Sequence, residues 1–291
     1  MKEIVVISGK GGTGKTSLTA SLAVLFENSV VADCDVDAAD LHLVLAPEVR
    51  ERHEFHAGNE AVIDAERCSG CGLCLDNCRF GAILEGRRDD GRPVFAMDPV
   101  GCEGCGVCVR FCPERAIDFP ECRCGEWMVS DTRCGPMVHA RLAAAAENSG
   151  KLVSTVRQQA RRIAEEQGRR WIVVDGPPGI GCPVIASVTG ADRVVAVTEP
   201  TVSGVHDLER VLALTRHFEI PTTVVVNKWD INPELATQVE QAARRAGAQV
   251  AGRIRYDLAV TKAQLQGRAV VETDCPVRQD ILAVFRSLTN Q

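Results

Sequence analysis

The sequence predicts an α/β protein in which a doubly wound, mostly parallel sheet is interrupted by a small inserted α+β module. Buried-type strands alternate with helical segments over most of the chain, and this alternation stops in a cysteine-rich stretch between residues 61 and 120. The 291 residues are enough for one large α/β domain and one small module. We therefore expect an outer domain of residues 1–60 and 121–291 and an inserted domain of residues 61–120.

The expected strands are short, rich in valine and almost continuously apolar, which is typical of strands buried on both faces of a parallel sheet. One of them leads into the acidic stretch VADCDVDAAD, and the others lie at residues 3–8, 171–175, 193–198, 222–227 and 249–254. Helical segments are expected at residues 151–167, 183–189, 204–217, 233–246, 257–267 and 276–288. Residues 121–150 show no clear pattern, and we expect them to form a linker back to the main domain.

A phosphate-binding loop lies between the first strand and the helical segment TSLTASLAVLF. Its residues fit the pattern G-x-x-x-x-G-K-[S/T] and are Gly9, Lys10, Gly11, Gly12, Thr13, Gly14, Lys15 and Thr16, with Ser17 following in the helix. Glycines let backbone N–H groups approach the phosphates, and the helix dipole favours an anion there. We expect Lys15 to reach the β- and γ-phosphates and the Thr16 hydroxyl to bind Mg²⁺. The alternative, a chance glycine-rich turn, is disfavoured by the flanking strand and helix.

Eight of the fourteen cysteines form two runs with the same spacing. CSGCGLCLDNC and CEGCGVCVRFC both read C-x₂-C-x₂-C-x₃-C, and the second run begins 34 residues after the first. In bacterial ferredoxins with this pattern, the fourth cysteine of each run binds the other cluster. We therefore predict two [4Fe–4S] clusters, one held by Cys68, Cys71, Cys74 and Cys112, the other by Cys102, Cys105, Cys108 and Cys78.

Zinc or free thiols are the alternatives for these cysteines, but zinc normally uses two separated C-x₂-C pairs rather than a tight run of four. Arg79 follows the last cysteine of the first run, where the second run has Pro113. Arg79 either raises the potential of the nearby cluster or simply faces water. Cys122, Cys124 and Cys134 form either a third metal site or a set of unligated thiols.

The stretch KGGTGKT, with Lys10 ahead of the glycines, resembles the deviant phosphate loop of the MinD–ParA class of P-loop ATPases. That class also includes the nitrogenase iron protein and the Mrp-type cluster carriers, and the resemblance covers both ends of this chain. It implies a SIMIBI-type nucleotide-binding fold. Since the early lysine of that class reaches the partner's nucleotide, the resemblance also implies a homodimer through the ATP site and catalytic roles for Lys10 and Lys15.

The same resemblance assigns several residues at strand ends. Asp33 and Asp35 resemble the switch I acids, and Asp35 matches the one that orients the attacking water. Asp175 in IVVDGPPGIG resembles the acid near Mg²⁺, and Asn227 matches an asparagine that contacts adenine. The residues Asn227 to Asp230 also fit N-K-x-D, a pattern that reads guanine. The deviant loop favours ATP, and GTP is the alternative.

Two positions remain open within the resemblance. Cys182 lies seven residues after Asp175, the offset at which the nitrogenase iron protein has a cysteine that binds a shared cluster. The alternative for Cys182 is a small apolar residue at the start of a helix. Arg255, in a stretch that resembles the late base-side loop of the class, stands where relatives often have proline.

Composition and charge restrict the partners. A formal net charge of −6 argues against a surface built for nucleic acid or anionic lipid. No apolar run approaches the ~18–20 residues of a membrane helix, and the start MKEIVVISGKGG lacks a signal-peptide layout, so we expect a cytoplasmic protein with no stable membrane anchor. The expected function is an ATPase that serves metallocluster assembly or delivery to a client metalloprotein. ATP-gated electron transfer to a redox partner and a MinD-like positioning ATPase are the alternatives.

Overall fold

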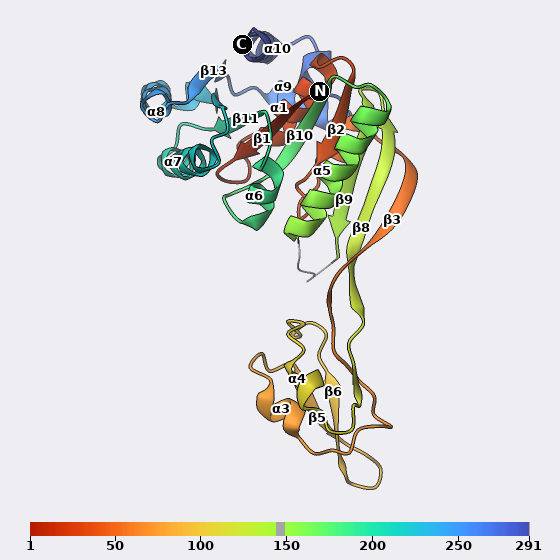
Figure 1. Cartoon of the computed structure of the whole chain (residues 1–291). Coiled ribbons are helices and arrows are strands. Elements are labelled where there is room, and N and C mark those ends of the chain that lie inside the picture. The colour runs from red at the N-terminus through yellow and green to blue at the C-terminus, as the bar shows by residue number, and fades with distance from the viewer. Residues whose placement is uncertain (144–148, 291) are drawn as a thin grey trace. The chain divides into compact units, whose positions relative to one another are not determined.

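The computed structural model describes residues 1–143 and 149–290 (Figure 1). The chain divides into two compact units. The larger unit comprises Met1–His53, Glu126–Leu142 and Ser149–Gln291, and the smaller one comprises Glu54–Gly125 and Ala143–Asn148. The chain therefore leaves the larger unit after His53 and returns to it at Glu126.

Among the described residues, the larger unit is built on a nine-stranded sheet in the order β13-β12-β11-β1-β10-β2-β9-β8-β3. Neighbouring strands from β13 to β9 pair in parallel, which confirms the predicted α/β class with a mostly parallel sheet. The bounds are β1 Lys2–Ser8, β2 Ser29–Asp33, β3 Glu48–Asn59, β8 Glu121–Thr132, β9 Gly135–Leu142, β10 Trp171–Pro178, β11 Arg193–Thr198, β12 Thr222–Asn227 and β13 Gln249–Ile254.

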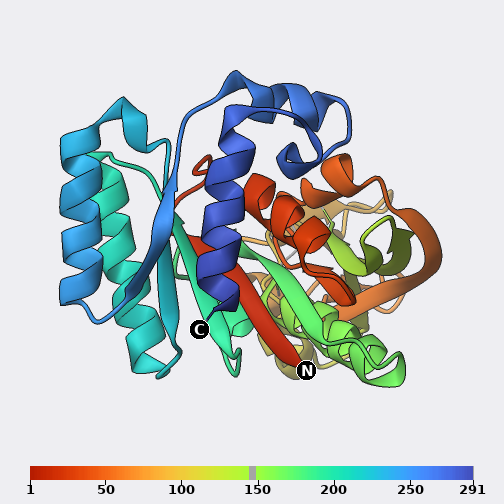
Figure 2. The same cartoon turned by 90° about the horizontal axis from the view of Figure 1, so that it is seen from above.

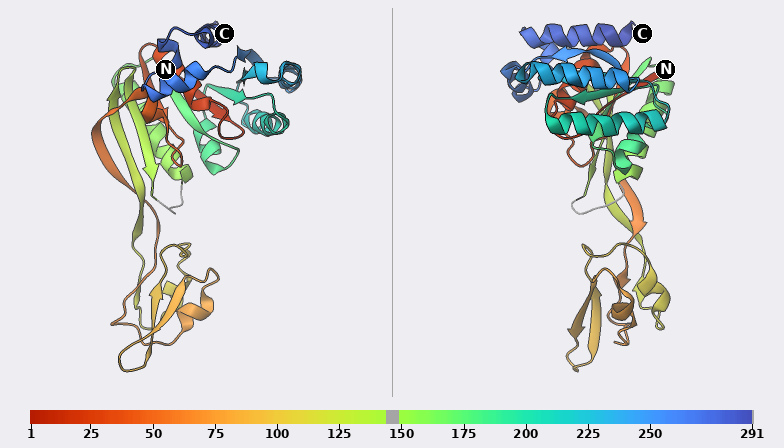
Figure 3. Two further views of the ribbon diagram at one scale, coloured as in Figure 1. Left: turned by 180° about the vertical axis from the view of Figure 1, so that it is seen from behind. Right: turned by 90° about the vertical axis from the view of Figure 1, so that its left-hand side faces the viewer.

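Helices cover both faces of this sheet (Figure 2). The helices α1 (Lys15–Leu25) and α10 (Pro276–Thr289) pack together on one face, near the shorter helices α2 (Leu41–Leu45) and α9 (Leu258–Leu265). The other face carries α5 (Ser149–Glu166), α6 (Cys182–Val188), α7 (Val202–His217) and α8 (Pro233–Arg245). Figure 3 shows α7 and α8 running side by side next to β12. The short 3-10 turns η1 (Trp229–Ile231) and η2 (Val270–Glu272) complete this unit.

The two cysteine runs of the smaller unit are similar in backbone conformation as well as in sequence. The helices α3 (Leu73–Asn77) and α4 (Val107–Phe111) contact each other, and each follows a glycine in the left-handed region, Gly72 with φ 80° and Gly106 with φ 69°. Two small antiparallel sheets pair β4 (Val62–Ile63) with β7 (Ile117–Asp118) and β5 (Ile83–Arg87) with β6 (Pro93–Met97). A small core joins aliphatic and aromatic side chains to the cysteines: Ala61, Cys74, Ile83, Phe95, Cys108 and Ile117.

The prediction of a linker at residues 121–150 is wrong, because β8, β9 and the start of α5 lie in this range. In β9 the residues 136–140 are all buried, yet they include a histidine and are flanked by glycine and arginine, so the strand has no clean apolar pattern. The strand β3 and the helix α2 also lie where we expected no element. Most residues of β3 are exposed and many of these are charged, which is typical of an edge strand and hides it from a pattern search.

None of the helices in the described ranges combines the length and the apolar character needed to cross a membrane.

Candidate functional site: a nucleotide cavity and two cysteine cavities

The carboxyl ends of β1, β2 and β10 meet at one edge of the sheet, where the phosphate loop begins. The parallel register pairs Asp33 with Asp175 and Ser8 with Pro178, so the acidic strand ends lie side by side. The loop between β1 and α1 turns with φ 76° at Gly12 and 88° at Gly14, conformations that favour glycine. A Cβ at Gly14 would also collide with Asn227 Nδ2, so a larger residue would have to displace this side chain.

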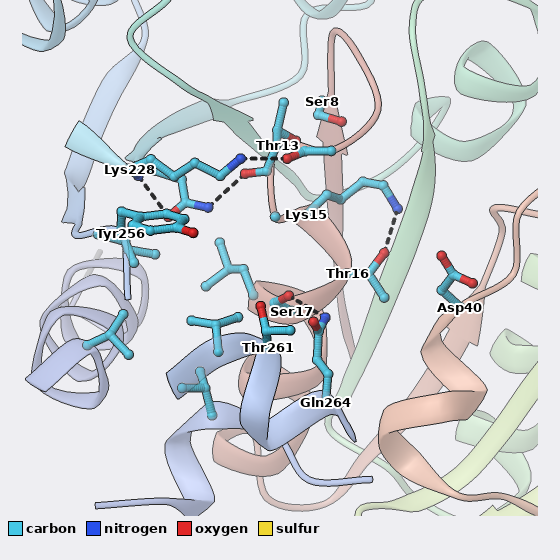
Figure 4. Close-up of a pocket in the computed structure, with 18 of the residues that line it drawn as sticks. Ser8, Thr13, Lys15, Thr16, Ser17, Asp40, Lys228, Tyr256, Thr261 and Gln264 are labelled. Carbon is cyan, nitrogen blue, oxygen red and sulfur yellow. Dashed lines mark hydrogen bonds between the residues drawn. The ribbon is translucent and has the colours of Figure 1, made fainter. Parts of the chain in front are cut away.

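A cavity of about 450 Å³ opens above this loop, within the range of small-molecule binding sites (Figure 4). Lys15 and Thr16 lie toward one end of the group drawn in Figure 4, whereas Lys228 and Tyr256 lie toward the other. The lining brings together the predicted residues 11–17, Asp35 and Asn227. These residues come from three separate segments of the chain, and the sheet order places them around one space.

Lys15 faces a group of acidic side chains. Its Nζ lies 2.9 Å from Asp175 Oδ1 and 3.3 Å from Asp35 Oδ2. Burial lowers the pKa of Lys15, but the charges of Asp175 and Asp35 outweigh burial and raise the pKa above its usual value. Lys15 is therefore a charged ammonium, which is the state that binds phosphate.

Asp33 differs from its neighbour Asp35. It is fully buried, its Oδ1 accepts the N–H of Asp35 at 3.2 Å, and its Oδ2 has no hydrogen-bond partner among the described residues. Burial, reinforced by the charge of Asp175, raises the pKa of Asp33 well above its usual range. Asp33 thus shapes the backbone at Asp35, while Asp35 itself lines the cavity.

The donor set beside Lys15 fits Mg²⁺. Thr16 Oγ1 donates to Asp175 Oδ2 at 2.8 Å, and Thr19 Oγ1 donates to Asp175 Oδ1 at 2.8 Å. Hydroxyl and carboxylate oxygens are the hard ligands that Mg²⁺ prefers. Since one lysine faces the carboxyl groups of both Asp175 and Asp35 here, an additional cation is electrostatically favoured at this position.

Lys10 is held by its own chain. Its Nζ lies 2.6 Å from Glu199 Oε1 and also donates to the hydroxyls of Thr201 at 3.2 Å and Ser203 at 3.0 Å. Lys228 Nζ binds the other oxygen of Glu199 at 3.0 Å and the Gly12 carbonyl at 2.8 Å. Burial raises the pKa of Glu199, but its two lysine partners outweigh burial and lower the pKa. Our sequence reasoning missed Glu199, although it follows the strand end VVAVT directly, beside the expected phosphate site.

The end of the cavity at Lys228 and Tyr256 separates the two residues of the N-K-x-D pattern. Asn227 lines the cavity, and its Nδ2 donates to the Thr13 carbonyl at 2.7 Å. Asp230 does not belong to the lining among the described residues, and its Oδ1 accepts the N–H of Tyr256 at 2.7 Å. The pattern therefore presents its asparagine, but not its aspartate, to the cavity.

Two small cavities in the smaller unit are lined by cysteines from both runs. One contains Cys68, Cys71, Cys74 and Cys112, and the other contains Cys78, Cys102, Cys105 and Cys108. These are the two sets of the crossed ferredoxin pattern. Within residues 1–143 and 149–290, no group of three or more His, Cys, Asp or Glu side chains has the spacing needed to hold a metal ion. A cubane cluster spreads its four thiolates farther apart than a single ion does, because each thiolate binds a different iron atom.

The remaining cysteines and Arg79 lie outside these cavities. Arg79 is exposed. Cys124 is buried and its Sγ donates to the Ala57 carbonyl at 3.0 Å, while burial and the neighbouring Cys124 raise the pKa of Cys122 to about 11. Cys134 is half-buried in the turn before β9, and Cys182 is exposed at the start of α6. None of them joins a metal-binding group within the described residues.

Known proteins resemble this chain over most of its length. The model of the CobQ/CobB/MinD/ParA nucleotide binding domain matches residues 4–270. An uncharacterized protein of Methanocaldococcus jannaschii is 34% identical over 234 residues, which cover 79% of each chain. A protein of the same organism named iron–sulfur cluster carrier protein is 22% identical over 306 residues, covering 99% of this chain and 84% of the relative.

Among solved structures, the MinC:MinD cell division protein complex of Aquifex aeolicus aligns with a TM-score of 0.60 and 21% identity, covering 100% of this chain and 97% of the other. This likeness shows a common fold. The family is shown by the match of the family model over residues 4–270, which includes the phosphate loop. The chain belongs to the CobQ/CobB/MinD/ParA family of nucleotide-binding domains and is an ATP-hydrolysing P-loop enzyme.

Proposed function

We propose that this ATPase is an iron–sulfur protein that dimerises on ATP and couples its nucleotide state to two [4Fe–4S] clusters, for assembly or delivery of metalloclusters to a client protein. The observation that carries the proposal is the pair of cavities lined by the crossed cysteine sets. In this proposal residues 61–120 are a ferredoxin-like domain inserted into a cytoplasmic ATPase domain of residues 1–60 and 121–291. The name of the relative from Methanocaldococcus jannaschii, iron–sulfur cluster carrier protein, agrees with the proposal.

The backbone around the cysteines supports cluster binding. Gly70 and Gly104 occupy equivalent places in the two runs, with φ 77° and 59°, and a Cβ at either would collide with a backbone carbonyl, that of Pro93 or Asn59. The N–H of Ala116 donates to Cys112 Sγ at 3.2 Å. Hydrogen bonds to the ligand sulfurs are one of the means by which proteins tune iron–sulfur clusters. In this proposal the chain thus holds eight thiolates in two loops of similar backbone conformation.

On the nucleotide side, residues 9–17 are proposed to cradle the phosphates, with Thr16 and Asp175 at Mg²⁺ and Asn227 at adenine. Asp35 is proposed to orient the attacking water, since it lines the cavity and its Oδ2 lies 3.3 Å from Lys15 Nζ. This arrangement puts the water-orienting carboxylate next to the phosphate-binding ammonium.

The Asp35→Asn variant is expected to bind ATP but to hydrolyse it about 100-fold more slowly, because the amide is a far weaker base than the carboxylate. Phosphate release, measured beside ATP affinity, checks this expectation. The matched control is Asp37→Asn, since Asp37 is exposed and lies two residues further along the same loop. Wild-type turnover in Asp35→Asn would assign the role to another group.

The proposed dimer requires Lys10 to exchange partners. Glu199 holds Lys10 within its own chain, so Lys10 must leave this carboxylate to reach the partner's nucleotide. We expect Glu199→Gln to strengthen ATP-dependent dimerisation and Lys10→Ala to weaken it, while ATP binding by the monomer persists in both. Sedimentation velocity with the non-hydrolysed analogue AMPPNP measures the dimer.

The controls for this prediction distinguish the effect of the Lys10–Glu199 contact from that of the Lys228–Glu199 contact. Lys228→Ala removes the second partner of Glu199 and tests whether an effect comes from the loop at Gly12 instead. The double variant Lys10→Ala with Glu199→Gln should behave like Lys10→Ala alone. Full ATP-dependent dimerisation of Lys10→Ala would remove the role of Lys10 in the dimer.

Iron transfer and a redox titration together separate delivery from electron transfer. Protein loaded with ⁵⁵Fe is mixed with an apo-[4Fe–4S] acceptor such as apo-aconitase, with and without ATP. A carrier transfers iron and sulfide in an ATP-dependent way. An electron donor keeps its iron, and its potential shifts with nucleotide, by about 60 mV for each tenfold change in affinity between oxidised and reduced protein.

A further inference from the structure

The base end of the nucleotide cavity carries an aromatic side chain. Tyr256 lies in the short loop between β13 and α9, and among the lining residues that the structure describes it is the only aromatic one. Its side chain is 52% exposed, and the aromatic stacking contacts of the described residues do not involve it. The ring thus borders the cavity without an aromatic partner among the described residues, at the end away from Lys15 and Thr16 (Figure 4).

Two carboxylates hold the backbone that carries this ring. Asp230, in η1, accepts the N–H of Tyr256 at 2.7 Å. Asp280, on α10, accepts the N–H of Arg255 at 3.1 Å through Oδ2. Two successive N–H groups of one loop are thus bound by acids from two distant elements. A loop held in this way loses less conformational freedom when a ligand packs on it.

We propose that Tyr256 is the stacking platform for the adenine ring of ATP and that Asp230 and Asp280 are positioning residues for this platform. The inference rests on the proposed placement of ATP, with its phosphates at Lys15 and its base at Asn227. Stacking of a base on an aromatic ring contributes about 5- to 150-fold in affinity. The proposal also assigns Asp230 a positioning role instead of a contact with the base, because Asp230 Oδ1 accepts the N–H of Tyr256.

The same contacts explain Arg255 at a position where relatives of the MinD–ParA class often have proline. A proline would remove the N–H and restrict the backbone φ. Here Asp280 accepts that N–H instead, and the guanidinium binds the same carboxylate through Nε at 2.7 Å and Nη2 at 2.9 Å. Bidentate pairs of this kind are strong and geometrically specific. The arginine–aspartate pair thus anchors the loop to α10 as a substitute for the rigidity of proline.

The first test uses the fact that the chain contains a single tyrosine. Full-length protein labelled with 3-fluorotyrosine gives one ¹⁹F resonance, that of Tyr256. We expect ATP and ADP with Mg²⁺ to shift this resonance through the ring current of the stacked base, and Mg²⁺-tripolyphosphate to leave it in place. No shift at saturating ATP, or an equal shift with tripolyphosphate, would overturn the platform.

The second test compares affinities for ATP and tripolyphosphate. We expect Tyr256→Leu to bind ATP roughly tenfold more weakly than the wild type and to bind tripolyphosphate with unchanged affinity. Tyr256→Phe should keep both affinities because it keeps the ring. Asp230→Asn retains an acceptor for the Tyr256 N–H and should behave like wild type. Asp230→Ala should lose ATP affinity and reduce the ¹⁹F shift although the tyrosine is intact.

The outcomes distinguish the platform from the nucleotide site as a whole. Tripolyphosphate binding that depends on Lys15, together with unchanged ATP affinity in Tyr256→Leu, would overturn the platform and leave the phosphate site standing. Absence of any tripolyphosphate binding would count against the placement of ATP itself. Tight GTP binding that Asp230→Asn abolishes would show that Asp230 reads guanine, and would overturn its positioning role.

Discussion

Replacement of Lys15 by alanine is expected to lower the affinity for ATP by about 100-fold or more. Lys15 Nζ is buried beside Asp175 and Asp35. In the variant, no ammonium group would separate the negative charges of the triphosphate from these carboxylates, and the two would repel each other. Loss of a buried charge partner costs about 2–5 kcal/mol, which corresponds to roughly 30- to 5,000-fold in affinity. Isothermal titration calorimetry with AMPPNP and Mg²⁺ measures this change.

Lys228→Ala is the matched control for Lys15→Ala. Lys228 lines the same cavity, but it binds Glu199 and the Gly12 carbonyl rather than the acids at the phosphate end. We expect its loss to weaken ATP binding less than the loss of Lys15. Thermal unfolding by circular dichroism shows whether each variant is folded. A folded Lys15→Ala protein with wild-type ATP affinity would contradict the phosphate-binding role of Lys15.

Anaerobically purified protein is expected to contain about eight iron atoms per chain, the sum of two [4Fe–4S] clusters. Cys112→Ser is expected to lower the iron content toward about four, because it removes one of the four thiols of a single cavity. Iron and acid-labile sulfide analysis measures the content. The electron paramagnetic resonance spectrum of the reduced protein should change from that of two interacting clusters to that of one isolated cluster.

Cys124→Ser is the control for the loss of a cysteine. Cys124 is buried outside both cavities, and a serine hydroxyl can still donate to the Ala57 carbonyl as its thiol does. We expect Cys124→Ser to keep its full iron content. Stoichiometric zinc with little iron in the wild-type protein would contradict the cluster proposal, and equal iron loss in both variants would indicate general destabilisation instead of lost ligation.

The central strands were predictable because their environment imposes a simple pattern. β1, β11 and β12 are buried on both faces, so nearly every position is apolar and the run is visible without knowledge of its neighbours. The strands β3 and β9 were not predictable in this way. β3 lies at the edge and keeps charged side chains in water, and β9 places His139 in a buried position where Ser130 satisfies its ring nitrogen at 2.8 Å.

The residues of the candidate site also differ in whether the sequence alone predicts their roles. The spacing of the phosphate loop and of the two cysteine runs was enough to predict roles for Lys15, Thr16 and the eight cysteines, because a short loop that wraps an anion or a cluster has its chemistry within a few consecutive residues. Glu199 and Tyr256 were not assigned, because each acts through partners more than twenty residues away in the sequence.

The contrast is sharpest for residues with two plausible tasks. N-K-x-D is compatible with either purine base when only the letters are considered, and Lys10 is compatible with a contact in its own chain or across a dimer. The order of strands in the sheet brings β11 beside β1, so that Glu199 meets Lys10, and β13 beside β12, so that Tyr256 meets Asp230. Local spacing determines which groups a loop presents, whereas the packing of distant elements decides which of those groups are free to act.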